Sequence, residues 1–443
     1  MEVMLRIFEL KYIKELFRLA LPIIMGNLGL IMLGATDCFV GGKYSTDALA
    51  AISVSTAINM TVVMLGLGMM FSISPILSNK RGANEDIKKY FLPSLLLAFI
   101  IGTLLMIVTF AYIPLLDLFG FEDKLLADVK LFTFILAFSS IGGVINATVK
   151  EFLQAYEIVF IPNLLLILSV FLNLILNFIF VFGMFGCPEM GVGGIALSTV
   201  LVRTVLAIIM ILYTRSKFKF EHYFELNYYK QILKIGFPIS MSIIIEFLAF
   251  NYIAVLMGRV SALYAAAHSV LMVLSSTSFM IPMGIANAIG VKVGYANGAK
   301  DYNEIIKYSK NGVLASVLFM VFAGCMFIIL PQQLVSIFTN DTNLISVIIP
   351  IMPILAFFQI FDGLQTSLRG IYNGLKRTKF VMISNVICYL FISISFGYYL
   401  GIIRKMYLKG CWFSVACSSV ILCTVLIGFL VYVLRKKKRE FSH

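Results

Sequence analysis

Long apolar segments recur along the whole chain, and they restrict its fold more than any other feature of the sequence. Each is about 20 residues long, the length of helix that crosses a hydrocarbon layer about 30 Å thick. Backbone polar groups find no water inside such a layer, so the segments are expected to be α-helices. Hydropathy predicts twelve spans, at approximately 18–41, 51–76, 91–115, 127–150, 160–183, 194–214, 236–257, 268–291, 311–331, 346–368, 380–401 and 411–434.

The composition supports an all-α polytopic membrane protein and gives no sign of an enzyme. Of the 443 residues, 60% are hydrophobic and only 13% are charged, whereas about a quarter of a soluble protein is charged. The chain has no P-loop G-x-x-x-x-G-K-[ST] for ATP hydrolysis. Seven cysteines, an odd number without a C-x-x-C pair, lie mostly in apolar runs. We therefore expect no catalytic site, cofactor or disulfide.

The net charge of +13 reflects how the chain is oriented in the membrane, because the basic residues are unevenly distributed between its two sides. With the twelve spans in place, 27 of the 35 Lys and Arg residues lie on the side of the two termini. Positive residues concentrate on the cytoplasmic side, so both termini are predicted to be cytoplasmic, in a multi-pass protein of the cell membrane. The basic start, "MEVMLRIFELKYIKELFRLALPI", leads into a full-length span and is interpreted as an amphipathic lead-in. No nucleic-acid partner is expected.

The two halves of the chain follow the same plan. "YIKELFRLALPI" (12–23) can be laid over "YYKQILKIGFPI" (228–239) with an offset of 216, which Gly82 and Gly298 keep. Further along, "QAY" at 154–156 is placed over "GIY" at 370–372. Six spans per half give two parallel repeats. The expected divisions are an N-terminal lobe (1–213), a cytoplasmic linker (214–235), a C-terminal lobe (236–434) and a basic tail (435–443).

Four ionisable residues lie well inside the predicted spans: Asp37, Arg203, Glu246 and Asp362. A central Asp or Arg costs about 2.5–3.5 kcal/mol on insertion scales, so each needs a partner or a wet cavity. An acid at this depth can hold a proton or a cation and exchange one for the other. The alternative is an acid hydrogen-bonded to a neighbouring helix. The partner of Arg203 cannot be read from the sequence.

The three acids do not repeat between the halves. With the offset of 216, Glu246 overlies Leu30, Asp37 overlies Ile253 and Asp362 overlies Asn146. A structural role shared by both halves would more naturally appear twice, so this asymmetry favours a functional role.

Further polar and backbone features accompany the acids. Asn173 and Asn177 share one helix face; they either supply amide oxygens to a cation near Asp37 or link neighbouring helices. Pro22 and Pro238 occupy equivalent places in the first span of each half. There they act as hinges or are ordinary membrane prolines.

Several motifs resemble the multidrug and toxic compound extrusion (MATE) family over roughly residues 12–434. They are "LPIIMGN", "GATDCFVGG", "SIIIEFLAF" and, most specifically, "FFQIFDGLQTSLRGIYNGLKRTK". The set of acids resembles the NorM-like branch. The DinF-like branch would place a second acid in span five, where this chain has Asn177.

The resemblance implies a secondary antiporter that exports organic cations or amphiphiles in exchange for Na⁺ or H⁺ by alternating access. Asp37 would be the coupling acid of the amino lobe, with Asn173, Asn177 and Thr199 beside it. Glu246 and Asp362 would bind the coupling ion and cargo in the carboxyl lobe, and Gln365 would help to bind the cargo. No metal is expected apart from Na⁺ at Asp37 or at Glu246 and Asp362.

Rival functions remain open at the level of sequence. A flippase for a lipid-linked oligosaccharide or similar amphiphile would have the same architecture but would be expected to line its cavity with basic residues. A membrane enzyme would need a nucleophile–base or metal cluster, and a passive channel would not move solute uphill. The expected partners are small molecules and membrane lipids, and the protein is expected to be a monomer.

Overall fold

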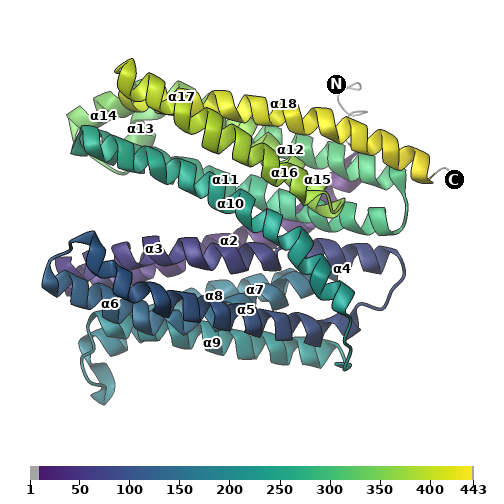
Figure 1. Ribbon diagram of the computed structural model, residues 1–443, viewed down its shortest axis with the longest axis horizontal. Helices are drawn as coiled ribbons and strands as arrows, with labels where there is room; N and C mark the ends of the chain where they lie inside the picture. Colours follow the sequence, from purple (N-terminus) through teal and green to yellow (C-terminus); the bar gives the residue numbers. More distant parts are fainter. Residues whose placement is uncertain (1–8, 442–443) are drawn as a thin grey trace. The chain divides into compact units, whose positions relative to one another are not determined.

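The computed structural model describes residues 9–441, and these fold into helices without a β-strand (Figure 1). Eleven helices in this part of the chain are long and apolar enough to cross a membrane. A twelfth span is a helix pair, Asp123–Ala137 and Ser139–Ala155, bent by 43° at the break. The predicted all-α architecture with twelve membrane helices is confirmed.

The first half contains six spans. They are α2 (Leu10–Tyr44), α3 (Thr46–Met70) with α4 (Ile73–Gly82), η1 (Lys88–Tyr90) with α5 (Phe91–Tyr112) and η2 (Ile113–Phe119), the bent pair α6 and α7, α8 (Phe160–Phe182) and α9 (Val192–Lys217). The short helix η3 (Met184–Gly186) lies between the last two. The expected lead-in is continuous with α2 from Leu10 onwards, and its residues 1–8 lie outside the described part.

The second half also contains six spans. They are α10 (Leu226–Val260), α11 (Ala262–Gly298), α12 (Tyr302–Ile329), α14 (Thr342–Ile348) with η4 (Ile349–Ile351) and α15 (Met352–Gly374), the group α16 (Thr378–Asn385), η5 (Val386–Ser393), α17 (Ile394–Tyr398) and η6 (Tyr399–Ile403), and α18 (Tyr407–Phe441). A short α13 (Pro331–Ser336) precedes α14. Most of the basic tail continues α18 as helix; residues 442–443 are outside the described part.

Local details of the backbone repeat between the halves. Ser45 caps α3 by accepting a hydrogen bond from the Ala48 N–H, and Ser261, 216 residues later, caps α11 in the same way. Asn84 and Lys300, also 216 apart, both have positive φ, 61° and 57°. The parallel repeat predicted from sequence landmarks is therefore present in the helix boundaries themselves.

The offset of the repeat has increased to 219 by the end of the fourth span. Glu157 (φ 64°) follows α7 as Lys376 (φ 58°) follows α15, and the backbone hydrogen bonds donated by these two residues and by the residue after each correspond. This corrects two sequence equivalences, because a few matching letters in apolar helices do not fix the register. Asp362 overlies Gly143 rather than Asn146, and 154–156 overlie 373–375 rather than 370–372.

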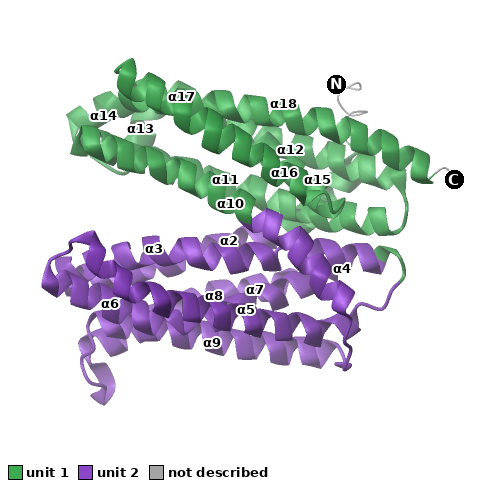
Figure 2. Cartoon of the chain, in the orientation of Figure 1, with its two compact units in different colours: residues 1–21, 82–84, 241–443 green, residues 22–81, 85–240 purple. Residues whose placement is uncertain are grey.

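The described chain forms two compact units (Figure 2). Unit 2 takes α2 from Pro22 onwards and the following helices as far as Ser240 of α10, apart from residues 82–84. Unit 1 takes α10 from Met241, all later helices, residues 82–84 and the start of α2 up to Leu21. Each half's first helix is thus divided between the units at or near its proline. This division differs from the boundaries expected from the sequence.

Glycines set the position of α15 against α11 in unit 1. A Cβ atom on Gly370 would collide with the Ala286 carbonyl oxygen, and one on Gly374 would lie 2.8 Å from the Gly294 nitrogen. This G-x-x-x-G spacing lets two helix backbones approach closely, as is common inside membranes. The contact fixes the face of α15 that carries Asp362, Gln365 and Arg369.

Candidate functional site

Asp37 is the centre of a buried polar cluster in unit 2. It lies on α2, and its side chain accepts hydrogen bonds from two other helices. Asn177 Nδ2 on α8 donates to Asp37 Oδ1 at 2.8 Å, and Thr199 Oγ1 on α9 donates to Oδ2 at 3.0 Å. Asp37 is only 9% exposed. The structure therefore brings together Asp37 and the neighbours Asn177 and Thr199 that the sequence predicted.

Asn173 completes the cluster from the same face of α8. Its Oδ1 accepts from Thr36 Oγ1 at 2.5 Å and from Asn177 Nδ2 at 3.2 Å, and its Nδ2 donates to Thr199 Oγ1 at 3.4 Å. Asn177 Oδ1 is fully buried and has no hydrogen-bond partner. A buried acceptor without a donor is costly unless something binds it. The two asparagines therefore link helices and also leave one oxygen ligand unused beside Asp37.

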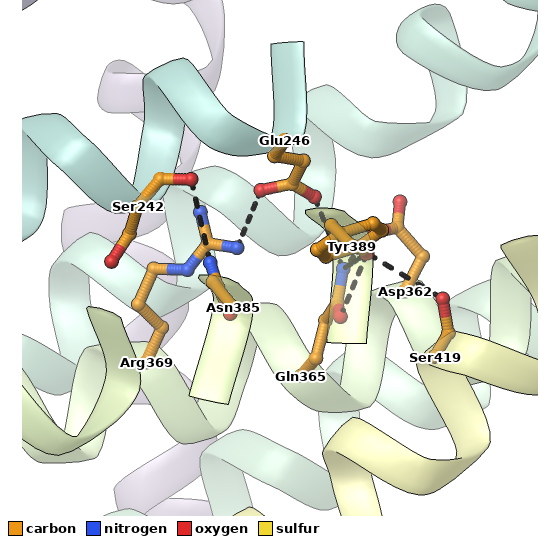
Figure 3. Close-up of polar contacts among 8 residues, drawn as sticks. All are labelled: Ser242, Glu246, Asp362, Gln365, Arg369, Asn385, Tyr389 and Ser419. Atoms are coloured by element: carbon orange, nitrogen blue, oxygen red, sulfur yellow. Dashed lines mark hydrogen bonds and ion pairs between the residues drawn. The ribbon is translucent and has the colours of Figure 1, made fainter. Parts of the chain in front are cut away.

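Glu246, Asp362 and Gln365 form a second cluster in unit 1 (Figure 3). The amide nitrogen of Gln365 lies 3.1 Å from Glu246 Oε1 and 2.7 Å from Asp362 Oδ1. Gln365 thus connects acids that are 116 positions apart in the chain. Asp362 and Gln365 are three residues apart on α15, on neighbouring positions of one face. The predicted grouping of these three residues is found in the structure.

Arg369 is a member of this cluster that the sequence interpretation missed. Its Nη2 lies 2.6 Å from Glu246 Oε2, so Glu246 stands between Arg369 and Gln365 (Figure 3). The span predicted from hydropathy ends at residue 368, which leaves Arg369 outside the membrane, but α15 continues to Gly374. The available signal was the spacing: positions 362, 365 and 369 recur every three or four residues, which is one helix face.

Tyr389 is a second residue that the sequence did not reveal. Its hydroxyl donates to Gln365 Oε1 at 3.1 Å and lies 3.5 Å from Ser419 Oγ. Tyr389 belongs to η5, a stretch of π-helix, where the wider turn shifts side chains relative to an α-helical pattern. Twenty tyrosines occur in the chain, and nothing local distinguishes this one. Only tertiary structure identifies it.

The remaining candidates have other direct partners or surroundings. Arg203 interacts electrostatically with Asp37, and its Nη1 donates a hydrogen bond to Ser139 Oγ at 3.0 Å. Pro22 and Pro238 lie inside the continuous helices α2 and α10. All seven cysteines are free. Within residues 9–441 no three His, Cys, Asp or Glu side chains gather as a metal site.

The oxygen groups of these clusters are suited chemically to binding positive charge. The cluster in unit 2 joins carboxylate oxygens to amide and hydroxyl partners, and the cluster in unit 1 also contains the Arg369 guanidinium. Hard cations prefer such oxygen ligands. The fold and these clusters define a polytopic helical membrane protein of the transporter type.

Comparison with known proteins gives the family. The family model described as MatE matches residues 22–179 and 238–399, one match in each half. The chain belongs to this family of multidrug and toxic compound extrusion transporters and is accordingly a transporter, not an enzyme. The two matches begin at Pro22 and Pro238, the equivalent prolines of the repeat.

Curated relatives are similar over nearly their whole length. A probable multidrug resistance protein NorM from Idiomarina loihiensis is 27% identical over 441 residues, covering 96% of this chain and 95% of the relative. One from Bacillus cereus is 27% identical over 435 residues, covering 96% of each. These relatives agree with the resemblance to the NorM-like branch.

Solved structures show the same fold. The eukaryotic MATE transporter AtDTX14 superposes with a TM-score of 0.87 at 18% identity, covering 98% of each chain. A MOP superfamily transporter from Pyrococcus furiosus, described as having a binding pocket of reverse polarity, superposes with a TM-score of 0.88 at 17% identity, covering 96% of each chain.

Proposed function

We propose that the protein is a secondary antiporter that exports cationic or amphipathic organic compounds in exchange for Na⁺ or H⁺ by alternating access. The observation that carries this proposal is the unpaired buried oxygen of Asn177 beside the Asp37 carboxylate. A cation bound there would find carboxylate and amide oxygens as ligands. The names of the NorM relatives support drug extrusion as the overall task.

The two clusters have different roles in this proposal. Asp37, with Asn173, Asn177 and Thr199, is the coupling-ion site of unit 2. Glu246 and Asp362, with Gln365, bind the coupling ion or the cationic cargo in unit 1. Gln365 contacts both carboxylates, so a change at either acid reaches the other through one amide. Pro22 and Pro238 serve as hinges, since the division between units falls at or near each of them.

The test is uphill efflux of a fluorescent organic cation from proteoliposomes, with Na⁺ and pH gradients imposed separately. Wild type should require one of the two gradients, and that gradient names the coupling ion. Asp37→Asn and Glu246→Gln should lose coupled efflux and remain folded. Glu221→Gln, which neutralises an exposed acid of the linker, is the matched control. Full transport by Glu246→Gln would exclude the assigned role of that residue.

A lipid flippase is the second candidate, and one observation favours it. Lys150 is buried in unit 2, and its Nζ donates to an amide oxygen, Asn27 Oδ1, at 3.2 Å. Such a cation could receive the phosphate of a lipid-linked sugar. The flippase replaces the antiporter if two results are obtained together. No gradient moves any cation in the proteoliposomes, and a fluorescent anionic lipid changes leaflet only in vesicles that contain the protein.

We further propose that the protein is a monomer in the cell membrane, with both termini cytoplasmic. The distribution of Lys and Arg supports this orientation. A fluorescent reporter fused to the C-terminus should be active when retained in the cytoplasm. If a reporter that is active only outside the cytoplasm works at the C-terminus instead, the proposed orientation is wrong.

A further inference from the structure

Arg369 is the one charged member of the unit 1 cluster that the exchange of cations does not explain. Its guanidinium makes a 2.6 Å ion pair with Glu246, and each of the two side chains is 13% exposed. Arginine keeps its proton in proteins, so it is a permanent positive charge. A transporter of cations thus has a permanent positive charge, Arg369, next to Glu246, the acid assigned to cargo binding.

Arg369 sets the formal charge of the unit 1 cluster. With both carboxyl groups ionised, Glu246, Asp362 and Arg369 sum to a single negative charge. In unit 2, Asp37 carries a single negative charge, and its hydrogen-bond partners Asn177 and Thr199 are neutral. Asp37 also interacts electrostatically with Arg203, whereas Glu246 forms a direct ion pair with Arg369.

The repeat shows that the position of Arg369 is shared but its partner is not. Lys150 stands 219 residues earlier, at the equivalent position of the fourth span, and is likewise buried. Lys150 contacts the neutral Asn27 of α2, whereas Arg369 contacts the acidic Glu246 of α10. A basic residue at this position is therefore common to both halves, and in unit 1 it forms an ion pair with an acid of the first helix.

We propose, on the basis of the antiport function above, that Arg369 determines the charge of the cargo that the transporter accepts. By neutralising Glu246 internally, Arg369 leaves the unit 1 cluster with a single negative charge and makes it select singly charged cations. A doubly charged cation would leave one positive charge buried without a partner, which is strongly unfavourable. The close packing of α15 on α11 at Gly370 and Gly374 holds Arg369 in place.

The first experiment compares two cargoes in proteoliposomes: the monocation tetraphenylphosphonium and the dication methyl viologen. Wild type should prefer the monocation. Arg369→Gln leaves two negative charges and should shift the efflux ratio towards the dication by about tenfold or more. Arg369→Lys keeps the charge and should keep the wild-type ratio. Lys150→Gln removes the equivalent buried cation of unit 2 and should leave the ratio unchanged.

The second experiment uses a double variant that restores the charge. Glu246→Gln alone brings the cluster to zero net charge and should lose monocation efflux. Glu246→Gln combined with Arg369→Gln returns it to one negative charge and should recover monocation efflux at least about tenfold over the single variant. The double variant contains neither member of the Arg369–Glu246 ion pair, so it keeps the proposal testable if Arg369→Gln alone does not fold because Glu246 has lost its partner.

The outcomes separate this proposal from the function on which it rests. A wild-type protein that moves neither cargo under any gradient refutes the antiport function itself. Wild-type efflux with an unchanged ratio in folded Arg369→Gln, an equal shift in Lys150→Gln, or no recovery in the double variant overturns the role of Arg369 alone. Loss of both cargoes in equal proportion assigns Arg369 a purely structural role.

Discussion

Lys150 and Arg369 occupy the same position of the internal repeat, 219 residues apart, yet they bind different groups. Lys150 donates to the Asn27 amide oxygen at 3.2 Å, and Arg369 pairs with the Glu246 carboxylate at 2.6 Å. The first helix of each half supplies the partner, an amide in one case and an acid in the other. The two halves therefore share one backbone arrangement but differ in the side chain that the basic residue contacts, which is neutral in one half and acidic in the other.

Thr199 should matter because it donates to a buried carboxylate. In Thr199→Val, Asp37 Oδ2 loses its 3.0 Å donor, and leaving a buried acceptor unpaired costs about 1–3 kcal/mol. We expect a lower melting temperature and several-fold slower efflux, with both restored in Thr199→Ser. Thr204→Val on the same helix removes an exposed hydroxyl bonded to its own backbone and should change neither. Wild-type efflux and melting in Thr199→Val would contradict this.

The prolines of α2 and α10 should affect the rate of transport rather than the binding of cargo. Alanine restores the backbone hydrogen bond that proline lacks and stiffens the helix. Pro22→Ala and Pro238→Ala should lower the maximal efflux rate, while equilibrium binding of the cargo to purified protein stays the same. Pro282→Ala changes a proline of α11, which lies wholly in unit 1, and serves as the control. Equal rates in all three variants and wild type would remove the hinge role.

Glu225 should make stability depend on acid pH. The Tyr90 hydroxyl donates to Glu225 Oε2 at 2.8 Å, and this bond holds the pKa of Glu225 below its ordinary value. A carboxyl group with a lowered folded-state pKa stabilises above the unfolded pKa of about 4.3, and the effect is lost as pH falls through the folded value.

The measurement is thermal unfolding between pH 7 and pH 3. Tyr90→Phe should melt at a lower temperature at pH 7, and the difference from wild type should shrink towards pH 3. Tyr223→Phe removes a longer contact of 3.2 Å to the same oxygen and should have a smaller effect. A difference between Tyr90→Phe and wild type that stays constant with pH would show that the hydroxyl acts through other contacts.

The paired serine caps should contribute equally to stability. Ser45→Ala and Ser261→Ala each remove the side-chain acceptor at a helix N-terminus, which costs about 1 kcal/mol. Denaturant unfolding in detergent should show similar losses for the two variants and recovery with Asp at either position. Ser53→Ala, at an exposed hydroxyl on α3, should be neutral. A loss in only one of the two cap variants would show that the repeated turns are not equivalent in energy.

Much of the site was visible in the sequence because buried charge in a membrane helix is rare and costly. Asp37, Glu246 and Asp362 stood out against apolar neighbours, and helical spacing placed Asn173 with Asn177 and Gln365 with Asp362. The same rarity rule missed Arg369, because a basic residue near the end of a span looks like one that reaches the interface. Tyr389 carried no charge and so gave no signal at all.

The sequence by itself determined that this chain crosses the membrane twelve times as two parallel repeats. Apolar length and the need to satisfy backbone hydrogen bonds leave no other regular structure for such segments. Tertiary structure alone decided that Arg369 pairs with Glu246, that the register reaches 219 at the fourth span, and that each first helix is divided between two units. These features depend on distances between helices far apart in the chain, and no local preference of the residues specifies such distances.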